Sequence, residues 1–215
     1  MIYHAIGTHL GDCWSSLNYV LFQDDPCISM YFLSHSRGWK KRNAGKHFRK
    51  MIPLFKDGDR IKVTEELPTV RLTWRGIYNV PGYHETVYPW AGEGSKKVAY
   101  QFNGRNNGFA KNCKPWEEAW ILEVLCELGY EPVQMGLPKS LKQSIKDLSR
   151  CCAFVGVESG FSVVSQSIVG LPITIIRNQI EEESIRHSQR GDGRIVKDAA
   201  EYIALLKSGQ IAGIG

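Results

Sequence analysis

Short apolar runs alternate along this chain with longer stretches whose apolar residues recur at helical spacing. In the first half this pattern predicts, in order, strand, helix, strand, helix, strand and a further extended segment, at Tyr3–Ile6, Cys13–Phe22, Ile28–Leu33, Trp39–Phe55, Arg60–Val63 and Val70–Trp74. In the second half strands and helices alternate at Lys97–Phe102, Trp116–Leu128, Glu131–Gln134, Lys139–Arg150, Ala153–Val157, Ser162–Val169 and Ile173–Ile176, before a last helix at Lys197–Lys207. Regular β/α alternation predicts an α/β fold with parallel sheets.

Between the two β/α series lies a stretch, residues 76–94, that is rich in proline, glycine and aromatic residues. This composition breaks regular structure and predicts a loop or linker. We therefore expect two Rossmann-like lobes with a cleft between them. The boundary is expected at Gly94–Lys96, which gives an N-terminal lobe of residues 1–95 and a C-terminal lobe of residues 96–215.

The composition is that of an ordinary globular protein, with 43% hydrophobic and 23% charged residues. No apolar run reaches the roughly 18 residues that a membrane span needs, and no basic stretch precedes an apolar core at the N-terminus. The six cysteines and six histidines are scattered without the spacing of metal ligands. Dispersed thiols fit a reducing compartment, so we expect a cytoplasmic protein without a metal site.

The net charge of +5 is concentrated in the N-terminal lobe, where residues 1–96 hold 13 Lys or Arg and 9 Asp or Glu. The segment from Arg37 to Lys50 contains only basic charges. Such a run is either a solvated helix face or a surface for a polyanion, and the sequence alone leaves both interpretations open.

Two polar, glycine-bearing turns follow strands of the C-terminal lobe, at Asn103–Arg105 and Glu158–Ser162. Backbone amides at such turns bind phosphate groups in open parallel sheets. Gly160 would allow close approach of a phosphate, whereas the neighbouring serines could simply cap the following helix. Arg105 would supply positive charge to a diphosphate, or it would be a surface arginine. Lys111 and Lys114 are weaker candidates for the same role.

Several short motifs occur in a characteristic order along the chain. Gly-Asp follows the first strand, and Gln101–Asn107, Pro-Trp, Met-Gly-Leu-Pro, Glu-Ser-Gly-Phe-Ser and Gly-Leu-Pro follow in the C-terminal lobe, at residues 11–12, 101–107, 115–116, 135–138, 158–162 and 170–172. In this order the chain resembles the heptosyltransferase-type glycosyltransferases of family nine, which have the two-lobed GT-B fold. Glu158 stands where that family usually has Asp, and both lobes are short.

The resemblance implies that the N-terminal lobe binds an acceptor and the C-terminal lobe a nucleotide-sugar. Asp12 is then the expected general base, with His9 as its rival on the same loop. The expected donor-binding residues are Gln101, Asn103, Gly104, Arg105, Met135, Gly136, Glu158, Ser159, Gly160, Phe161 and Ser162. The expected acceptor-binding residues are Arg37, Lys40, Lys41, Arg42 and Trp90. We expect a metal-independent, inverting transfer with no cofactor besides the donor substrate.

The acceptor remains open between two classes. The resemblance implies a glycan or lipopolysaccharide-type sugar, but the basic segment and the aromatic residues of the linker also suit a hydroxymethylated base in DNA. Compact viral genomes tend to carry small transferases, and a phage-encoded enzyme would act on DNA in the host cytoplasm. The alternative to an enzyme is a nucleotide- or DNA-binding module that has lost catalysis.

Overall fold

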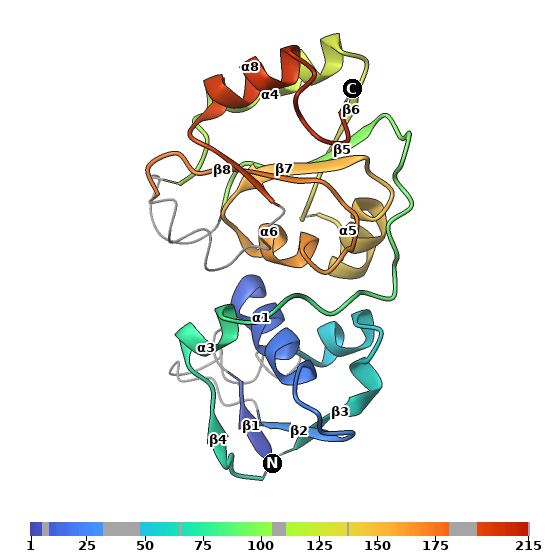
Figure 1. Cartoon of the computed structure of the whole chain (residues 1–215), viewed down its shortest axis with the longest axis vertical. Helices are drawn as coiled ribbons and strands as arrows, with labels where there is room; N and C mark the ends of the chain where they lie inside the picture. Colours follow the sequence, from blue (N-terminus) through green and yellow to red (C-terminus); the bar gives the residue numbers. More distant parts are fainter. Residues whose placement is uncertain are drawn as a thin grey trace. The chain divides into compact units, whose positions relative to one another are not determined.

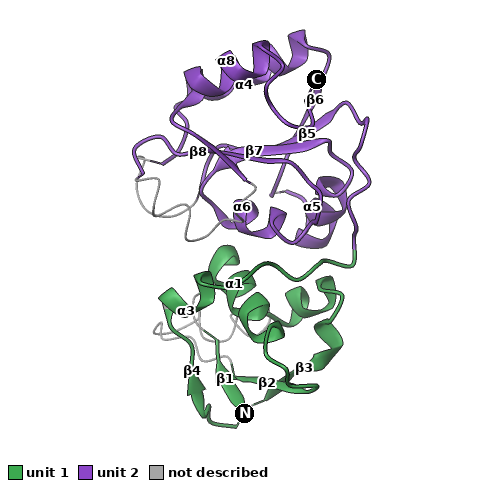
Figure 2. Ribbon diagram, in the orientation of Figure 1, with its two compact units in different colours: residues 1–87 green, residues 88–215 purple. Residues whose placement is uncertain are grey.

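The computed structural model describes residues 1–5, 9–31, 48–64, 66–104, 111–136, 138–180 and 193–214 (Figure 1). The chain forms two compact units, unit 1 from Met1 to Val87 and unit 2 from Tyr88 to Gly215 (Figure 2). The change of unit at Val87 lies a short way before the boundary expected at Gly94–Lys96. Each unit has its own parallel sheet, which confirms the predicted α/β fold of two Rossmann-like lobes.

The four-stranded sheet of unit 1 has the order β3-β2-β1-β4, and all its pairs are parallel. Tyr3 in the central strand pairs with Met30 on one side and Val70 on the other. The elements of unit 1 are β1 (Ile2–His4), α1 (Leu10–Leu21), β2 (Ile28–Tyr31), η1 (Ile52–Leu54), η2 (Gly58–Arg60), β3 (Ile61–Thr64), β4 (Val70–Arg71) and α3 (Trp74–Tyr78).

The core of unit 1 forms around the apolar face of α1. Trp14, Leu17 and Leu21 recur at helical spacing and are at most 1% exposed. The Trp14 ring lies 4.2 Å from that of Phe55, measured between ring centroids. Each such burial contributes about 1.5–3 kcal/mol, so this face holds α1 in place.

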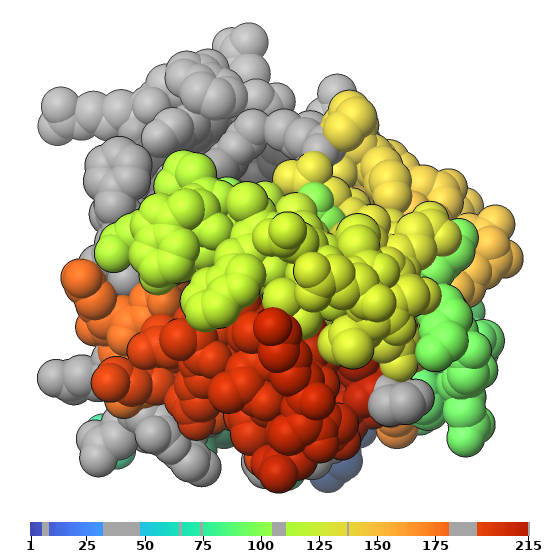
Figure 3. All heavy atoms as spheres, turned by 90° about the horizontal axis from the view of Figure 1, so that it is seen from above, coloured from blue at the N-terminus to red at the C-terminus, as the bar shows by residue number. Residues whose placement is uncertain are grey.

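Unit 2 is a three-layer α/β/α arrangement built on a five-stranded parallel sheet of order β6-β5-β7-β8-β9. Helices α4 and α8 cover one face of the sheet and α5 and α6 the other (Figure 1), and Figure 3 shows the outer surface of α4 and α8 side by side. The elements are β5 (Lys97–Gln101), α4 (Pro115–Glu127), β6 (Glu131–Gln134), α5 (Leu141–Leu148), β7 (Ala153–Val157), α6 (Gly160–Ser165), β8 (Ile173–Ile176), β9 (Arg194–Val196) and α8 (Ala199–Lys207). Every residue of β7 is buried, as expected for a central strand covered on both faces.

Both strand orders contain a point at which the chain changes direction across the sheet. In unit 2 the chain passes from β5 to β6 on one side and then returns to β7 on the other side of β5. In unit 1 the corresponding reversal lies between β1 and β4. Open parallel sheets bind ligands outside the carboxyl ends of the two strands at such a reversal. The fold therefore singles out the segments after β5 and β7, and those after β1 and β4.

Helix α3 and strand β9 were not predicted from the sequence. Helix α3 occupies residues expected to be extended or irregular, because Thr73 caps it by accepting a hydrogen bond from Gly76 N at 3.1 Å. Five residues are too few to display helical periodicity, and a Thr N-cap was the available signal. Strand β9 was not predicted, since it is a three-residue edge strand beginning with an exposed arginine. Of the expected basic helix at Trp39–Phe55, residues 48–51 are helical, and its residues 39–47 lie outside the described residues.

None of the helices in the described part of the chain is both long and apolar enough to cross a membrane.

Candidate functional site

In unit 2 the paired strands β5 and β7 end side by side, and a glycine stands where they end. Gln101 pairs with Gly156 across the two strands. A Cβ added to Gly156 would lie 2.5 Å from the Gln101 carbonyl oxygen, closer than real Cβ atoms come. The glycine therefore lets the two candidate phosphate turns, after Gln101 and after Val157, begin side by side.

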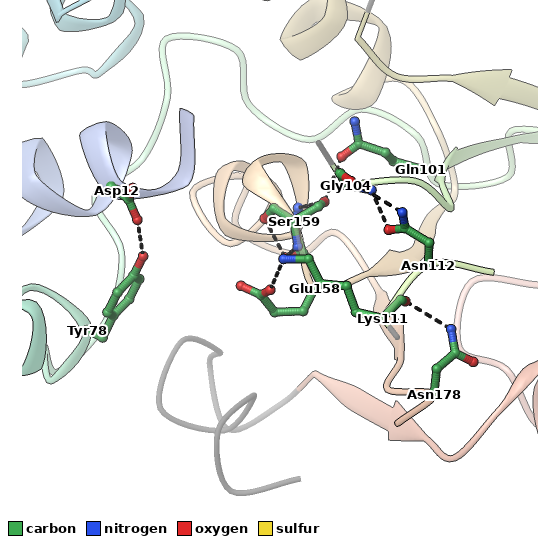
Figure 4. Close-up of polar contacts among 10 residues, drawn as sticks. Asp12, Tyr78, Gln101, Gly104, Lys111, Asn112, Glu158, Ser159 and Asn178 are labelled. Atoms are coloured by element: carbon green, nitrogen blue, oxygen red, sulfur yellow. Dashed lines mark hydrogen bonds and ion pairs between the residues drawn. The ribbon is translucent and has the colours of Figure 1, made fainter. Parts of the chain in front are cut away.

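Residues 111–113 form a strap across these strand ends (Figure 4). The Asn112 side-chain oxygen accepts a hydrogen bond from Gly104 N at 2.8 Å, and Cys113 N donates to the Phe102 carbonyl at 3.0 Å. Asn178, which follows β8, donates from its side chain to the Lys111 carbonyl at 2.9 Å. The strap thus ties the end of β5 to the end of β8 and fixes the backbone from which the Lys111 side chain extends.

Lys111 extends its ammonium group to Glu158, the first residue after β7. Lys111 Nζ lies 2.8 Å from Glu158 Oε2. The two side chains are 12% and 29% exposed, so the pair is partly shielded from solvent. A Cβ on Gly104 would lie 3.3 Å from Lys111 Cε, which places the lysine stem against the turn after β5. Positive charge is therefore held between the two turns expected to bind phosphate.

The two serines of the second turn cap α6. Ser159 Oγ accepts from Ser162 N at 3.3 Å, and Ser162 Oγ accepts from Ser159 N at 2.9 Å. Ser162 Oγ also donates to the Ser159 carbonyl at 2.7 Å. This capping box engages both serine hydroxyls and both serine amides. A phosphate-binding role of this turn stays a prediction, and it would fall to the backbone of Gly160 and Phe161.

The remaining residues expected to bind the donor differ in their exposure. Met135 and Phe161 are buried, at 3% and 5% exposed, while Gly136 has a φ of +95°, which favours glycine. Asn103 is exposed and donates from its side chain to Glu118 Oε2 on α4 at 2.9 Å. Arg105 lies outside the described residues. The donor-binding roles of all these residues stay predictions.

In unit 1 the predicted general base lies at the other reversal point. Asp12 stands in the first turn of α1, after β1, and Tyr78 ends α3, after β4. The Tyr78 hydroxyl donates to Asp12 Oδ1 at 2.8 Å (Figure 4). His9, the rival base, is the N-cap of α1 and makes no side-chain capping bond. Tyr78 is one of the aromatic residues of the linker that the sequence suggested as a surface for a DNA base, and no local pattern indicated its contact with Asp12.

Trp90, expected to bind the acceptor, is anchored in unit 2. Its Nε1 donates to the Cys151 carbonyl at 2.9 Å, and a Cβ on Gly170 would lie 2.8 Å from the indole ring. The structure thus gives Trp90 a packing role, and acceptor binding by its half-buried ring stays a prediction. The other four expected acceptor-binding residues lie outside the described residues: Arg37, Lys40, Lys41 and Arg42.

Within the described residues, no three His, Cys, Asp or Glu side chains are grouped to hold a metal ion. Cys113 is the last residue of the strap, and burial raises the pKa of its thiol to about 12, against a contact with Asn178 that lowers it. Burial likewise raises the pKa of Cys151 to about 12, with Cys152 and Asp147 adding to the shift and nearby Lys97 and Lys139 opposing it. Both thiols are held as neutral groups rather than as ligands or nucleophiles.

Comparison with solved structures identifies the class of fold. The chain is similar to the dodecameric iron-containing heptosyltransferase TibC in complex with ADP-D-β-D-heptose, with a TM-score of 0.57 and 11% identity over 91% of this chain. It is also similar to an E. coli ADP-heptose LPS heptosyltransferase II, with a TM-score of 0.52 and 12% identity over 96% of this chain and 97% of the other. A second structure of TibC, from enterotoxigenic E. coli H10407, gives a TM-score of 0.54 at 12% identity.

The chain spans 61% of the TibC chain. No protein-family model matches the sequence. No curated protein matches it either. At this level of identity the likeness is one of fold, the two-lobed GT-B arrangement of sugar transferases. It agrees with the strand orders and with the fold that the motif order implied.

Proposed function

We propose that this chain is a glycosyltransferase that takes a sugar from a nucleotide-sugar and transfers it to a hydroxyl group of an anionic acceptor. The observation that carries the proposal is the meeting of two polar turns and a shielded lysine at the strand reversal of unit 2. Lys111 and Glu158 lie there, 2.8 Å apart, beside Gly104. This is the place where a sheet of this order binds a phosphorylated ligand.

The donor that we propose first is an ADP-linked sugar of the heptose type. The similarity of fold to proteins described with ADP-heptose supports this choice. Lys111 would neutralise the diphosphate, because its ammonium contacts Glu158 in one turn and its stem lies beside Gly104 in the other. Glu158 would accept hydrogen bonds from the ribose hydroxyls once the nucleotide draws Lys111 toward its phosphates.

The transfer that we propose is a single displacement with inversion. The acceptor oxygen attacks the anomeric carbon while the Asp12 carboxylate takes the hydroxyl proton. The bond from the anomeric carbon to the diphosphate oxygen breaks, and its electron pair leaves with the nucleoside diphosphate. Lysine and backbone amides would stabilise this leaving group without a metal ion. Activity that persists in excess chelator would support this point, and loss of activity that Mg²⁺ or Mn²⁺ restores would contradict it.

For the acceptor we propose a glycan of the lipopolysaccharide type that carries phosphate or acidic groups. The fold of the E. coli ADP-heptose LPS heptosyltransferase II supports a sugar acceptor, and the basic segment at Arg37–Lys50 supports an anionic one. Neutralising Lys40, Lys41 and Arg42 together should weaken acceptor binding and flatten its salt dependence. If the chain transfers the sugar to hydroxymethylated DNA and not to a glycan, the proposed acceptor is wrong and DNA takes its place.

The experiment begins with a thermal-shift panel of nucleoside diphosphates and nucleotide-sugars, because a ligand of the native state raises the melting temperature. The ligand that binds is then incubated with acceptors, and release of nucleoside diphosphate is measured. Asp12→Asn keeps the shape of the side chain but cannot take a proton, so turnover should fall at least about a hundredfold while donor affinity stays the same. Binding without any turnover or donor hydrolysis would instead indicate a non-catalytic nucleotide-binding module. If no nucleotide binds, the proposal is wrong.

A further inference from the structure

The side chain of Gln101 is held in a fixed orientation at the end of β5 (Figure 4). Its Oε1 accepts a hydrogen bond from Ser159 Oγ at 2.6 Å. Ser159 Oγ in turn accepts from Ser162 N at 3.3 Å. A chain of two hydrogen bonds therefore runs from the first turn of α6 to the Gln101 amide.

The single proton of the Ser159 hydroxyl decides which end of the Gln101 amide faces it. A hydroxyl has one proton to donate. If the amide were reversed, Ser159 Oγ would face two N–H donors, and the hydrogen bond that takes its own proton would be lost. Ser159 therefore selects Oε1, and the Nε2 group of Gln101 points away from the cap. The described residues offer Nε2 no acceptor, so its two protons are available to a ligand.

Nε2 borders a position that no side chain fills. The point where a Cβ of Gly136 would lie is 3.6 Å from Gln101 Nε2 and 3.6 Å from Phe161 Cε2. Gly136 has a φ of +95°, a conformation in which other residues are strained, so the sequence keeps this position free of a side chain. A hydrogen-bond donor and the edge of an aromatic ring thus face the same point at the end of β6.

We infer that Gln101 is a specificity-determining residue, which donates from Nε2 to an acceptor atom on the base of the donor nucleotide. This inference rests on the proposed function, since it assumes that a nucleotide binds at this strand reversal. A flat, partly apolar base suits a position between an aromatic edge and an amide donor. The diphosphate is better matched by the Lys111 ammonium, which lies on the β7 side of β5.

The role predicts a graded loss of affinity at this position. Gln101→Met keeps the length of the side chain and removes the donor, so nucleotide affinity should fall about tenfold, as expected for one lost hydrogen bond. Gln101→Glu keeps an acceptor for Ser159 but turns an oxygen toward the ligand where Nε2 was. Two acceptors would then face each other, so Gln101→Glu should lose more affinity than Gln101→Met.

The test measures dissociation constants for the nucleoside, monophosphate and diphosphate of the base that the wild-type chain prefers. Gln143→Met is the matched control, because Gln143 donates its Nε2 to Asp147 within α5 and not to a group of the candidate site. We expect Gln101→Met to weaken all three ligands by the same factor, and Gln143→Met to weaken none. The melting temperature of each variant without ligand shows whether unit 2 still folds.

Three results would overturn the inference. Equal affinities for wild type and both Gln101 variants would leave the residue with a packing role only. A loss confined to the phosphorylated ligands would move the contact from the base to the phosphates. Absence of nucleotide binding by the wild-type chain would overturn the proposed function as well, whereas the first two results leave that function standing.

Discussion

Lys111 and Glu158 form the ion pair that joins the two strand ends of the candidate donor site, with 2.8 Å between Nζ and Oε2. The lysine comes from the strap after β5, and the glutamate is the first residue after β7. Without a ligand, Glu158 neutralises the positive charge of Lys111, which would otherwise attract a diphosphate. In the proposed complex a nucleotide-sugar would offer Lys111 an anion of higher charge and leave Glu158 to the ribose, so one pair would supply both contacts.

The first prediction concerns Lys111→Met. This change removes the ammonium but keeps the stem that packs against Gly104. Affinity for a nucleoside diphosphate should fall about ten- to a hundredfold, because a charge-assisted contact contributes about 1.5–3 kcal/mol. Affinity for the nucleoside alone should stay the same. Titration calorimetry at two salt concentrations measures both, and the salt dependence of diphosphate binding should flatten.

Lys139→Met is the control for this prediction. Lys139 forms a similar pair with Asp147, also with 2.8 Å between the charged atoms, but on α5 and the loop before it. Lys139→Met should change the free energy of unfolding by about 1 kcal/mol or less, because partly exposed ion pairs contribute little, and it should leave nucleotide affinity unchanged. Equal effects of the two variants on diphosphate binding would refute a specific role of Lys111.

The second prediction separates packing from acceptor binding at Trp90. Trp90→Phe removes the hydrogen bond from Nε1 to the Cys151 carbonyl and part of the ring beside Gly170. The free energy of unfolding should fall by about 1–3 kcal/mol, since a buried carbonyl loses its donor and a void forms. KM for the acceptor should stay the same if Trp90 only packs. A rise in KM without a loss of stability would support the acceptor-binding role predicted from the sequence.

The central strands of unit 2 could be predicted from the sequence because they are short apolar runs bounded by polar turns. Ala153–Val157 and Ile173–Ile176 are such runs and have the predicted bounds, as does the partly exposed edge strand Glu131–Gln134. Burial on both faces of a parallel sheet demands such runs, so the pattern is strong. Strand β9 escaped prediction because an edge strand of three residues needs no such pattern.

The candidate site could be predicted less completely, because its contacts join residues far apart in the sequence. Glycine-bearing turns after strands predict where a phosphate binds, and that led to Gly104 and Ser159. No local pattern indicates that Asn178 would hold the Lys111 backbone, or that Tyr78 would contact Asp12, 66 residues earlier. Such pairs are set by strand order, which a single sequence does not display.

The third prediction uses the cysteines as reporters of burial. The thiolate is the reactive form, and burial raises the pKa of Cys113 and Cys151 to about 12. Cys27 and Cys126 are exposed. At pH 7.5 iodoacetamide should therefore label Cys27 and Cys126 in the native protein, and all six cysteines only in denaturant. Mass spectrometry locates the labels. Labelling of Cys113 at the rate of Cys126 in the native protein would contradict the packing of the strap.

The last prediction compares two tyrosine hydroxyls. In Tyr78→Phe the Asp12 carboxylate loses a donor at 2.8 Å, so the proposed base is held less firmly, and turnover should fall about tenfold while donor affinity stays unchanged. Tyr202 is fully buried on α8, and its hydroxyl has no partner among the described residues. Tyr202→Phe should therefore leave turnover unchanged and keep or raise the melting temperature, because it removes an unsatisfied polar group. Steady-state kinetics and thermal unfolding measure both variants. If Tyr78→Phe turns over like Tyr202→Phe, the hydrogen bond to Asp12 has no part in the reaction, and Asp12→Asn then decides whether Asp12 does.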